Sequence, residues 1–224
     1  MKKPIAFLLT LTLLLSSFPI ASALDSTNEN KAETISAEEF FQAIQDEYAK
    51  FHIGYTAEGY DPSATFTQDF LNERLNDIRS RMSSVTNYSE ELQSFVEIIP
   101  EPEPLDTAVP NAVMPYTYSM TKTIKSPSNM GAADIYAEVD TTIDAQYNVF
   151  MSIDDMTTKQ LGYAFNFESW TQHDGFESKI WTQNGASNME CYATGTLVVS
   201  WTGPVAGIKH SYSSEHTIGG GATL

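Results

Sequence analysis

The chain has 224 residues with a single cysteine, and its 29 acidic against 12 basic side chains give a formal charge of −17. A field of this sign repels nucleic acid and anionic lipid, so neither is expected as a partner. With Cys191 alone no intramolecular disulfide can form, and the fold must be stabilised by burial of apolar side chains.

The first 23 residues have the pattern of a secretory signal. Lys2 and Lys3 precede an apolar run from Ile5 to Leu15, and Ala21-Ser22-Ala23 is a small-residue cleavage site. The run is shorter than the roughly 18 apolar residues that a membrane span needs, and no later stretch reaches that length. We therefore expect a secreted, extracellular protein with no membrane span. Its mature chain keeps 10 basic against 29 acidic residues, a formal charge of −19.

The N-terminal part of the mature chain is expected to be helical. Residues 24–35 are polar and are predicted to be a disordered lead-in. Ser36 stands three residues before Glu39, the spacing of a capping box, in which each side chain satisfies a free backbone amide at a helix start. Apolar residues follow at helical intervals, and Gly54 is a plausible end for this first helix.

About three short helices are predicted within residues 36–99. The second has apolar residues at alternating intervals of four and three: Leu71, Leu75, Ile78, Met82 and Val85. All three arginines of the chain lie on it beside acidic residues, and we interpret them as a solvated face with weak ion pairs. A third helix is predicted from Ser89 to Ile99, where Pro100 ends it.

A linker and a β domain complete the chain. Residues 100–115 include Glu101-Pro102-Glu103-Pro104, and this alternation favours an extended, hydrated linker. From residue 116 to 224 the apolar residues recur with a period of two. About seven such segments, separated by turn residues, predict an antiparallel β-sandwich and, less well, a barrel. The predicted fold class is α+β, a helical region followed by the sandwich.

The strongest strand signal lies between residues 133 and 153. Residues 143–153 alternate strictly between apolar and polar side chains, which is typical of a strand with one buried and one wet face. Residues 133–139 alternate in the same way, so two neighbouring strands are predicted around a turn at Asp140-Thr141-Thr142. A polar loop is predicted at residues 154–158, and Gly219-Gly220-Gly221 is interpreted as a tail.

The candidate site depends on a hairpin at Asp174-Gly175. Asp-Gly between alternating strands favours a two-residue type I′ turn, which would pair His173 with Phe176. In that register one face is the core and holds Phe165, Phe167, Phe176 and Ile180. The opposite face holds the candidate ligand-binding residues Glu168, Trp170, Gln172, Lys179 and Trp181.

The two tryptophans of this face are its functional signal. With Trp170 opposite Lys179 and Glu168 opposite Trp181, the two indoles are diagonal neighbours. Flat rings among carboxylate, amide and ammonium groups resemble a platform on which sugar rings stack. In the alternatives the helical region covers this face, or the face is exposed and binds nothing. A register slip of one residue would send both rings inward.

Other chemistry has weaker signals. His210 and His216 would be roughly 20 Å apart along one strand, too far to share a metal ion. A zinc site using His173 and Asp174 stays open as an alternative, as does a structural calcium ion in the loops, but no EF-hand pattern is present. Cys191 is interpreted as a buried small apolar residue rather than a nucleophile. No cofactor and no catalytic residue are predicted.

These patterns favour a secreted, non-catalytic binding protein whose sandwich presents an aromatic and polar face to a glycan or a cell-surface protein. One alternative is a self-assembling extracellular matrix or structural component that pairs through an exposed strand. The least favoured alternative is a hydrolase using paired carboxylates among Asp134, Glu138, Asp140 and Asp144. The oligomeric state is not predicted.

Overall fold

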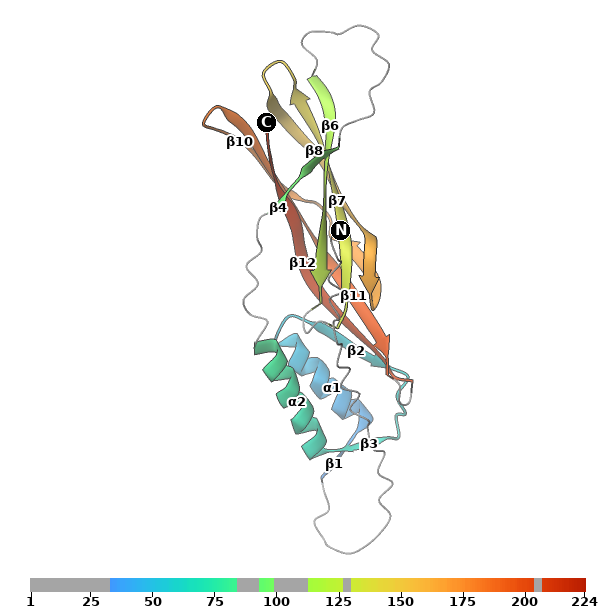
Figure 1. Cartoon of the computed structure of the whole chain (residues 1–224). Helices are drawn as coiled ribbons and strands as arrows, with labels where there is room; N and C mark the ends of the chain where they lie inside the picture. Colours follow the sequence, from blue (N-terminus) through green and yellow to red (C-terminus); the bar gives the residue numbers. More distant parts are fainter. Residues whose placement is uncertain (1–32, 84–92, 99–112, 127–129, 204–206) are drawn as a thin grey trace, which may run out of the picture. The chain divides into compact units, whose positions relative to one another are not determined.

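The computed structural model describes residues 33–83, 93–98, 113–126, 130–203 and 207–224. The described chain is mostly antiparallel β-sheet with two α-helices (Figure 1). None of the helices in these ranges is long and apolar enough to cross a membrane. The predicted signal, most of the lead-in and most of the linker lie outside the described residues.

The described residues form two helices and twelve strands. The helices are α1 (Ala37–Ala49) and α2 (Gln68–Ser83). The strands are β1 (Thr34–Ser36), β2 (Gly54–Glu58), β3 (Thr65–Thr67), β4 (Gln93–Ser94), β5 (Val96–Ile98), β6 (Val113–Lys125), β7 (Ala132–Asp144), β8 (Val149–Phe165), β9 (Phe167–Gln172), β10 (Glu177–Gln183), β11 (Ala186–Thr202) and β12 (Lys209–Thr223).

The predicted capping box begins helix α1. The hydroxyl of Ser36 accepts the backbone N–H of Glu39 at 3.2 Å, and the Glu39 carboxylate accepts the backbone N–H of Ser36 at 2.9 Å. The helix ends at Ala49 with Lys50 as its C-cap, and Gly54, the predicted end, instead begins β2. The third helix is not confirmed: its described part, residues 93–98, forms the short strands β4 and β5, and the rest lies outside the described ranges.

The helices pack through aromatic rings and one partly buried ion pair. The ring of Phe40 stacks on Phe66 at 4.2 Å and on Phe70 at 5.5 Å between centroids. Glu47 on α1, only 3% exposed, accepts two hydrogen bonds from the guanidinium of Arg79 on α2, each 2.8 Å. Arg79 therefore joins two helices instead of belonging to a solvated face.

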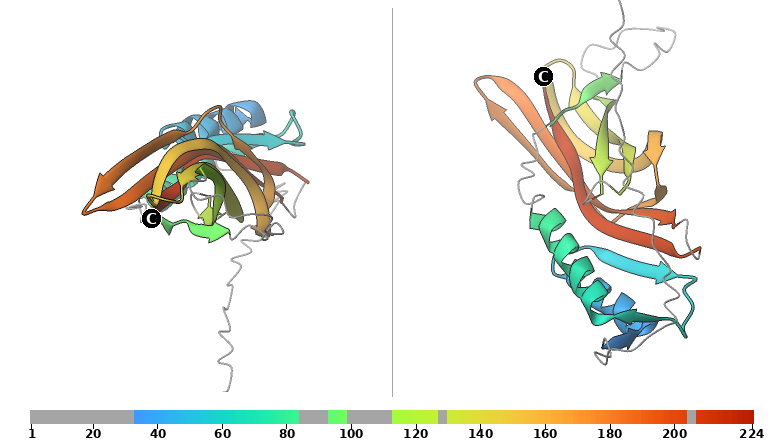
Figure 2. Two further views of the ribbon diagram at one scale, coloured as in Figure 1. Left: turned by 90° about the horizontal axis from the view of Figure 1, so that it is seen from above. Right: turned by 60° about the horizontal axis from the view of Figure 1, so that its bottom comes forward.

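The strands form three sheets. β1 pairs with β3 in a two-stranded ribbon that brings together the starts of α1 and α2. Sheet B has the order β10-β11-β12-β2, with β9 also beside β11 and β4 beside β12. Sheet C has the order β5-β6-β7-β8. Strand β2, from the predicted helical region, is thus an edge strand of sheet B, as Figure 2 shows beside the helices.

We call the face of sheet B that points into the hydrophobic core its inner face, and the opposite one its outer face. The inner face carries the odd-numbered residues of β11, which alternate strictly with half-buried ones. Sheet C meets part of this face: the sulfurs of Cys191 on β11 and Met156 on β8 are 3.2 Å apart. Helix α1 meets another part, where Tyr48 contacts Tyr212 at 5.3 Å between ring centroids.

The predicted strand around residues 143–153 is wrong in its turn positions. β7 continues to Asp144, and the turn is at residues 145–148, where Tyr147 is 69% exposed. The Asp144 carboxylate accepts the backbone N–H groups of Gln146 and Tyr147, and Asn148 has a φ of 53°. Asp144 and Asn148 are therefore the residues that form the turn, and the alternation of apolar residues around them concealed this signal.

Two further predictions are corrected. Residues 154–158 belong to strand β8 instead of a loop, and the carboxylate of Asp154 accepts hydrogen bonds from Thr142 and Ser152. The Gly219-Gly220-Gly221 segment is not a tail: it lies inside β12 and pairs with residues 190–192 of β11. The glycines are ordinary members of an antiparallel ladder.

The register predicted for the Asp174-Gly175 hairpin is wrong. β9 and β10 do not pair with each other; both lie along β11, β9 beside residues 195–199 and β10 beside residues 186–192. The type I′ geometry occurs at the next turn, where Asn184 and Gly185 have φ values of 54° and 82°. Phe165, predicted to be buried, is 46% exposed.

Candidate functional site

The structure separates the two tryptophans of the predicted site. Trp170 pairs with Leu197 and lies on the inner face of sheet B, where its ring covers the bare Cα of Gly195. Trp181 pairs with Asn188 and lies on the outer face. Strands β9 and β10 follow one another along β11, and in residues 169–172 of β9 as in β10 the even-numbered residues face inward. The even-numbered Trp170 and the odd-numbered Trp181 therefore point to opposite sides of the sheet.

Trp170 and Gln172 hold sheet B against sheet C. The indole N–H of Trp170 donates to the hydroxyl of Thr158 at 2.9 Å. The side chain of Gln172 accepts the backbone N–H of Thr158 at 2.6 Å and donates to the carbonyl of Met156 at 2.8 Å. Both predicted site residues therefore occupy structural positions inside the fold.

Glu168 is on the outer face but away from Trp181. It is the extra residue of a β-bulge, since its neighbours Phe167 and Ser169 pair with consecutive residues of β11. Its carboxylate accepts a hydrogen bond from Lys209 at 2.8 Å. Hydrogen bonds from Lys209 and from nearby hydroxyl groups lower the pKa of Glu168.

Trp181 and Lys179 lie on the same face of β10. The ammonium of Lys179 lies 5.2 Å from the centre of the Trp181 ring, a cation–π contact worth about 0.5–1 kcal/mol at an exposed position. Trp181 is half-buried and Lys179 is exposed. Because the contact is weak and Lys179 is exposed, a ligand that stacks on the Trp181 ring can displace the lysine.

The neighbours of Trp181 on the outer face form three rows across β10, β11 and β12. The ladder pairings define these rows as Trp181, Asn188 and Thr223; Lys179, Glu190 and Gly221; and Glu177, Tyr192 and Gly219. We call these nine residues the platform. The Tyr192 ring lies over Gly219, since a Cβ at that glycine would collide with it. Trp181 and Tyr192 thus lie in the two outer rows, and Lys179 and Glu190 lie in the row between them.

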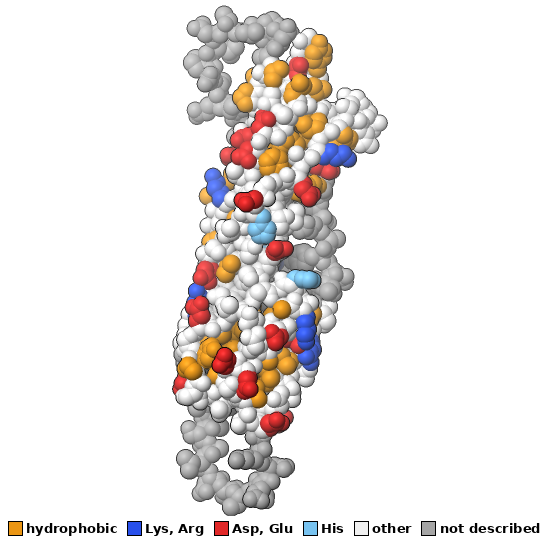
Figure 3. Space-filling model, turned by 180° about the vertical axis from the view of Figure 1, so that it is seen from behind, with side chains coloured by type: hydrophobic (Ala, Val, Ile, Leu, Met, Phe, Trp, Pro, Cys, Tyr) orange, Lys and Arg blue, Asp and Glu red, His pale blue; other side chains and the backbone are white. Residues whose placement is uncertain are grey.

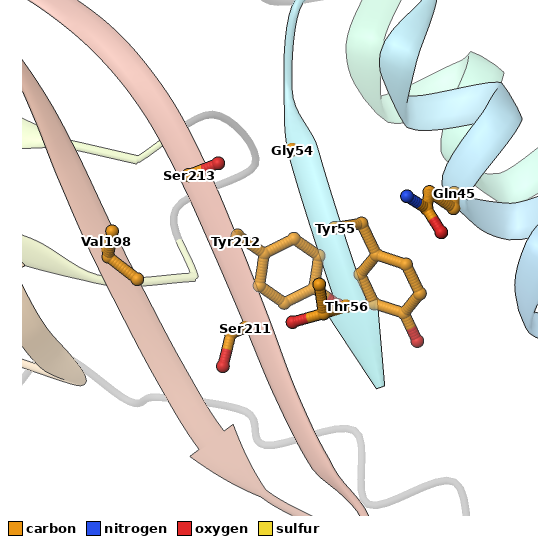
Figure 4. A pocket seen from close by; sticks show the side chains of 8 residues that line it. All are labelled: Gln45, Gly54, Tyr55, Thr56, Val198, Ser211, Tyr212 and Ser213. Atoms are coloured by element: carbon orange, nitrogen blue, oxygen red, sulfur yellow. The ribbon is translucent and has the colours of Figure 1, made fainter. Parts of the chain in front are cut away.

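A hollow of about 280 Å³ lies farther along sheet B, beside Gly54 (Figure 4). Gly54 lets the side chain of Ser213 lie close to β2, because a Cβ at residue 54 would collide with the Ser213 hydroxyl. The lining combines hydroxyl, amide and apolar groups without a charged side chain: Gln45, Gly54, Tyr55, Thr56, Val198, Ser211, Tyr212 and Ser213. It fits a small uncharged polar group.

His210 and His216 on β12 lie on the inner face of sheet B. His210 stacks on Trp201 at 4.9 Å between centroids, and its Nδ1 is 2.9 Å from the hydroxyl of Tyr55. Nε2 of His216 is 2.8 Å from the Ser214 hydroxyl. Burial lowers the pKa of His210 and, together with the positive charge of Lys122, lowers that of His216 to about 4.

The acidic residues considered for catalysis lie on the face of sheet C opposite the core. Asp134 accepts hydrogen bonds from Thr123 and from the backbone N–H of Tyr163, and Asp140 accepts one from Thr117. In the part of the chain that the structure describes, no group of three or more His, Cys, Asp or Glu residues is placed to hold a metal ion.

Cys191 is fully buried in the core beside Met156. Burial raises the pKa of its thiol to about 12, so the reactive thiolate is scarce at neutral pH. This environment is that of a small apolar core residue.

The residues missed by sequence reasoning are Asn188, Glu190, Tyr192 and the glycines of β12. The signal for the first three was the turn at Asn184-Gly185: a two-residue loop there pairs Gln183 with Ala186 and therefore Trp181 with Asn188. The glycines of β12 come from a strand farther along the chain, and no local pattern connects them to Trp181.

Comparison of this chain with protein-family models, with curated proteins and with solved structures gives no match in any of the three.

Proposed function

We propose that the protein is a secreted, non-catalytic binding protein that takes a glycan on the outer face of sheet B. The observation that carries the proposal is the pair of aromatic side chains, Trp181 and Tyr192, on the platform. Sugar rings stack their apolar faces on such rings, and neighbouring polar side chains bind the hydroxyl groups. Secretion rests on the signal pattern of residues 1–23.

The platform offers the groups that sugar recognition needs. Asn188 supplies an amide, Glu190 a carboxylate and Lys179 an ammonium group, all within one face of three adjacent strands. Gly219 and Gly221 leave room on this face for the side chains of Tyr192 and Glu190, because a Cβ at either glycine would meet them.

The scaffold supports a rigid platform. We infer that sheets B and C are the two layers of the β-sandwich expected from the sequence. The contact between Cys191 and Met156 and the hydrogen bond from Trp170 to Thr158 support this inference. A binding face on strands held from behind by a packed core loses little conformational entropy when a ligand binds.

Affinity electrophoresis and isothermal titration against a panel of soluble polysaccharides test the proposal. Trp181→Ala is expected to weaken binding by about tenfold, equivalent to about 1.4 kcal/mol. Tyr147→Ala is the matched control, since it removes an exposed aromatic ring from the turn between β7 and β8 and should leave binding unchanged. Unaltered affinity of Trp181→Ala would remove the platform as the binding site.

A second candidate function is self-assembly, and it is favoured by exposed apolar side chains on β8. Leu161, Tyr163 and Phe165 are 53%, 57% and 46% exposed. Such a stripe on an edge strand can pack against a second copy of the chain. Light scattering over a range of concentrations tests it, with Tyr163→Ser expected to reduce any association. A strict monomer at high concentration contradicts this candidate.

A further inference from the structure

We infer that the glycan lies lengthwise along the outer face of sheet B, from the platform at Trp181 to the hollow beside Gly54. The protein would then bind the interior of an extended, uncharged polysaccharide chain. This inference rests on the proposed function and goes beyond it, because it names the extent of the site and the class of glycan.

The first support is that both features lie along the same pair of strands. Asn188 belongs to the platform and Val198 to the lining of the hollow, and both are outer-face residues of β11. Ten residues of strand separate them, which is about 33 Å at the usual rise per residue. A bound monosaccharide could not reach both features, whereas an extended chain could.

The second support is the surface between the two features. Along β11 it presents the hydroxyl groups of Thr194 and Thr196, and along β12 it presents those of Ser213 and Thr217 with the carboxylate of the exposed Glu215 between them. Thr194 and Thr217 are within hydrogen-bonding distance at 3.4 Å, and His173 on the same face is 2.8 Å from the Thr196 hydroxyl. These groups donate and accept hydrogen bonds, as the hydroxyl groups of a sugar chain require.

The third support is the hollow itself. Its outer-face side chains are Thr56, Val198, Ser211 and Ser213, so it combines an apolar patch with three hydroxyl groups. Figure 4 shows the hydroxyl groups of Thr56 on β2, the strand that contains Gly54, and of Ser211 and Ser213 on the neighbouring strand β12. This composition suits one sugar unit of a longer chain better than a charged or a wholly apolar group.

Charge excludes acidic polysaccharides. Among the described residues of the outer face the lysines are Lys179 at one end and Lys209 near the other, and Lys209 is paired with Glu168. Acidic side chains are spread over the side of the molecule seen in Figure 3, and basic ones are few. With a chain charge of −17, a polyanion such as heparin would be repelled.

The test compares chain length, charge and position. The probes are hydroxyethyl cellulose, soluble xylan and galactomannan as uncharged polymers, heparin and polygalacturonate as polyanions, and oligosaccharides of increasing length from the uncharged polymer that binds. Val198→Trp fills the hollow, and Thr194→Trp obstructs the surface between the hollow and the platform. Thr121→Trp, on the exposed face of sheet C, is the matched control. Circular dichroism confirms that each variant is folded.

The expected result is binding to an uncharged polymer that Trp181→Ala, Val198→Trp and Thr194→Trp each weaken by about tenfold. The shortest oligosaccharide that binds should be sensitive to Trp181→Ala and insensitive to Val198→Trp. If both bulky variants bind the polymer as the parent does while Trp181→Ala still weakens binding, the lengthwise path is wrong and the proposed function stands. Preferential binding of a polyanion overturns the assignment of an uncharged glycan. Absence of binding to every probe overturns the proposed function as well.

Discussion

The side-chain amide of Gln172 pairs with the backbone edge of β8 at Thr158. Its oxygen accepts both the N–H and the hydroxyl of Thr158, at 2.6 and 2.7 Å, and its nitrogen donates to the carbonyl of Met156 at 2.8 Å. A single glutamine thus takes the place of a neighbouring strand at the middle of an edge strand. Open edges invite pairing with other chains, so this side chain both joins the layers and covers the edge.

We predict that Gln172→Ala destabilises the fold by about 2 kcal/mol, because it leaves two backbone groups of β8 without their partners. A chain of this size should then lose roughly 4–8 °C in melting temperature, measurable by calorimetry. Gln183→Ala on β10 is the control, since that glutamine is exposed. If the Gln172 side chain keeps other chains from pairing with the edge of β8, light scattering should also show that Gln172→Ala associates at a lower concentration than the unaltered protein.

The ion pair between Glu47 and Arg79 gives a prediction with a defined pH window. Hydrogen bonds from the Arg79 guanidinium, with help from Lys50, lower the pKa of Glu47 to about 2 from an ordinary value of 4.5. The carboxylate therefore stabilises the fold fully above about pH 4.5, and this contribution is lost as the pH falls toward 2. Glu47→Gln should cost about 1–2 kcal/mol at neutral pH, reduced by the half-exposure of Arg79.

Denaturant unfolding between pH 2 and pH 7 measures this effect. Glu47→Gln should flatten the fall in stability between pH 4.5 and 2, whereas Asp77→Asn, which removes an exposed pair with Arg81, should change stability by less than about 0.5 kcal/mol. Equal effects of the two substitutions would show that burial of Glu47 contributes nothing.

Local chemistry could be predicted from the sequence where one short segment contains the whole interaction. Ser36 and Glu39 satisfy each other across one helical turn, so their spacing was sufficient. Strand periodicity likewise indicated strands from residue 116 onward, because a wet and a buried face impose a period of two wherever a strand pairs. Neither prediction needed knowledge of a distant partner.

The site could not be predicted because it depends on which strands pair. Asp174-Gly175 and Asn184-Gly185 look equally suited to a two-residue turn, yet only Asn184 joins its glycine at positive φ. The strands flanking Asp174 instead pair with β11, whose register decides that Trp170 points inward and Trp181 outward. The alternation within each strand predicted which residues share a face, but which face of β9 matches which face of β10 depends on their pairing with β11 in the tertiary structure.

The contact of Trp170 with Gly195 predicts a strong effect of a single methyl group. A Cβ at residue 195 would lie within 2.6–2.8 Å of atoms of the indole ring, closer than van der Waals contact allows. Gly195→Ala should therefore cost about 1–3 kcal/mol through displacement of the ring. In a Trp170→Leu background the same substitution should cost much less, and a double-mutant cycle in denaturant measures the difference. Additive costs would show that the two residues do not interact.

Half-buried His216 should make the fold sensitive to mild acid. Its pKa in the fold is about 4 against an ordinary 6.5, because burial and Lys122 on β6 disfavour the charged form and Ser214 is the hydrogen-bonding neighbour. The unfolded chain thus binds a proton first, so stability is full above pH 6.5, falls as the pH decreases to 4, and changes no further through this group below 4. His216→Gln should reduce the dependence of the unfolding free energy on pH between 6.5 and 4, as measured by urea unfolding. Part of the dependence should remain in this variant, because burial also lowers the pKa of His210.

His52→Asn, at an exposed position, is the control and should leave the pH dependence of the unfolding free energy unchanged. A parent protein whose stability is constant between pH 6.5 and 4 would mean that water reaches His216 and that the layers are open there.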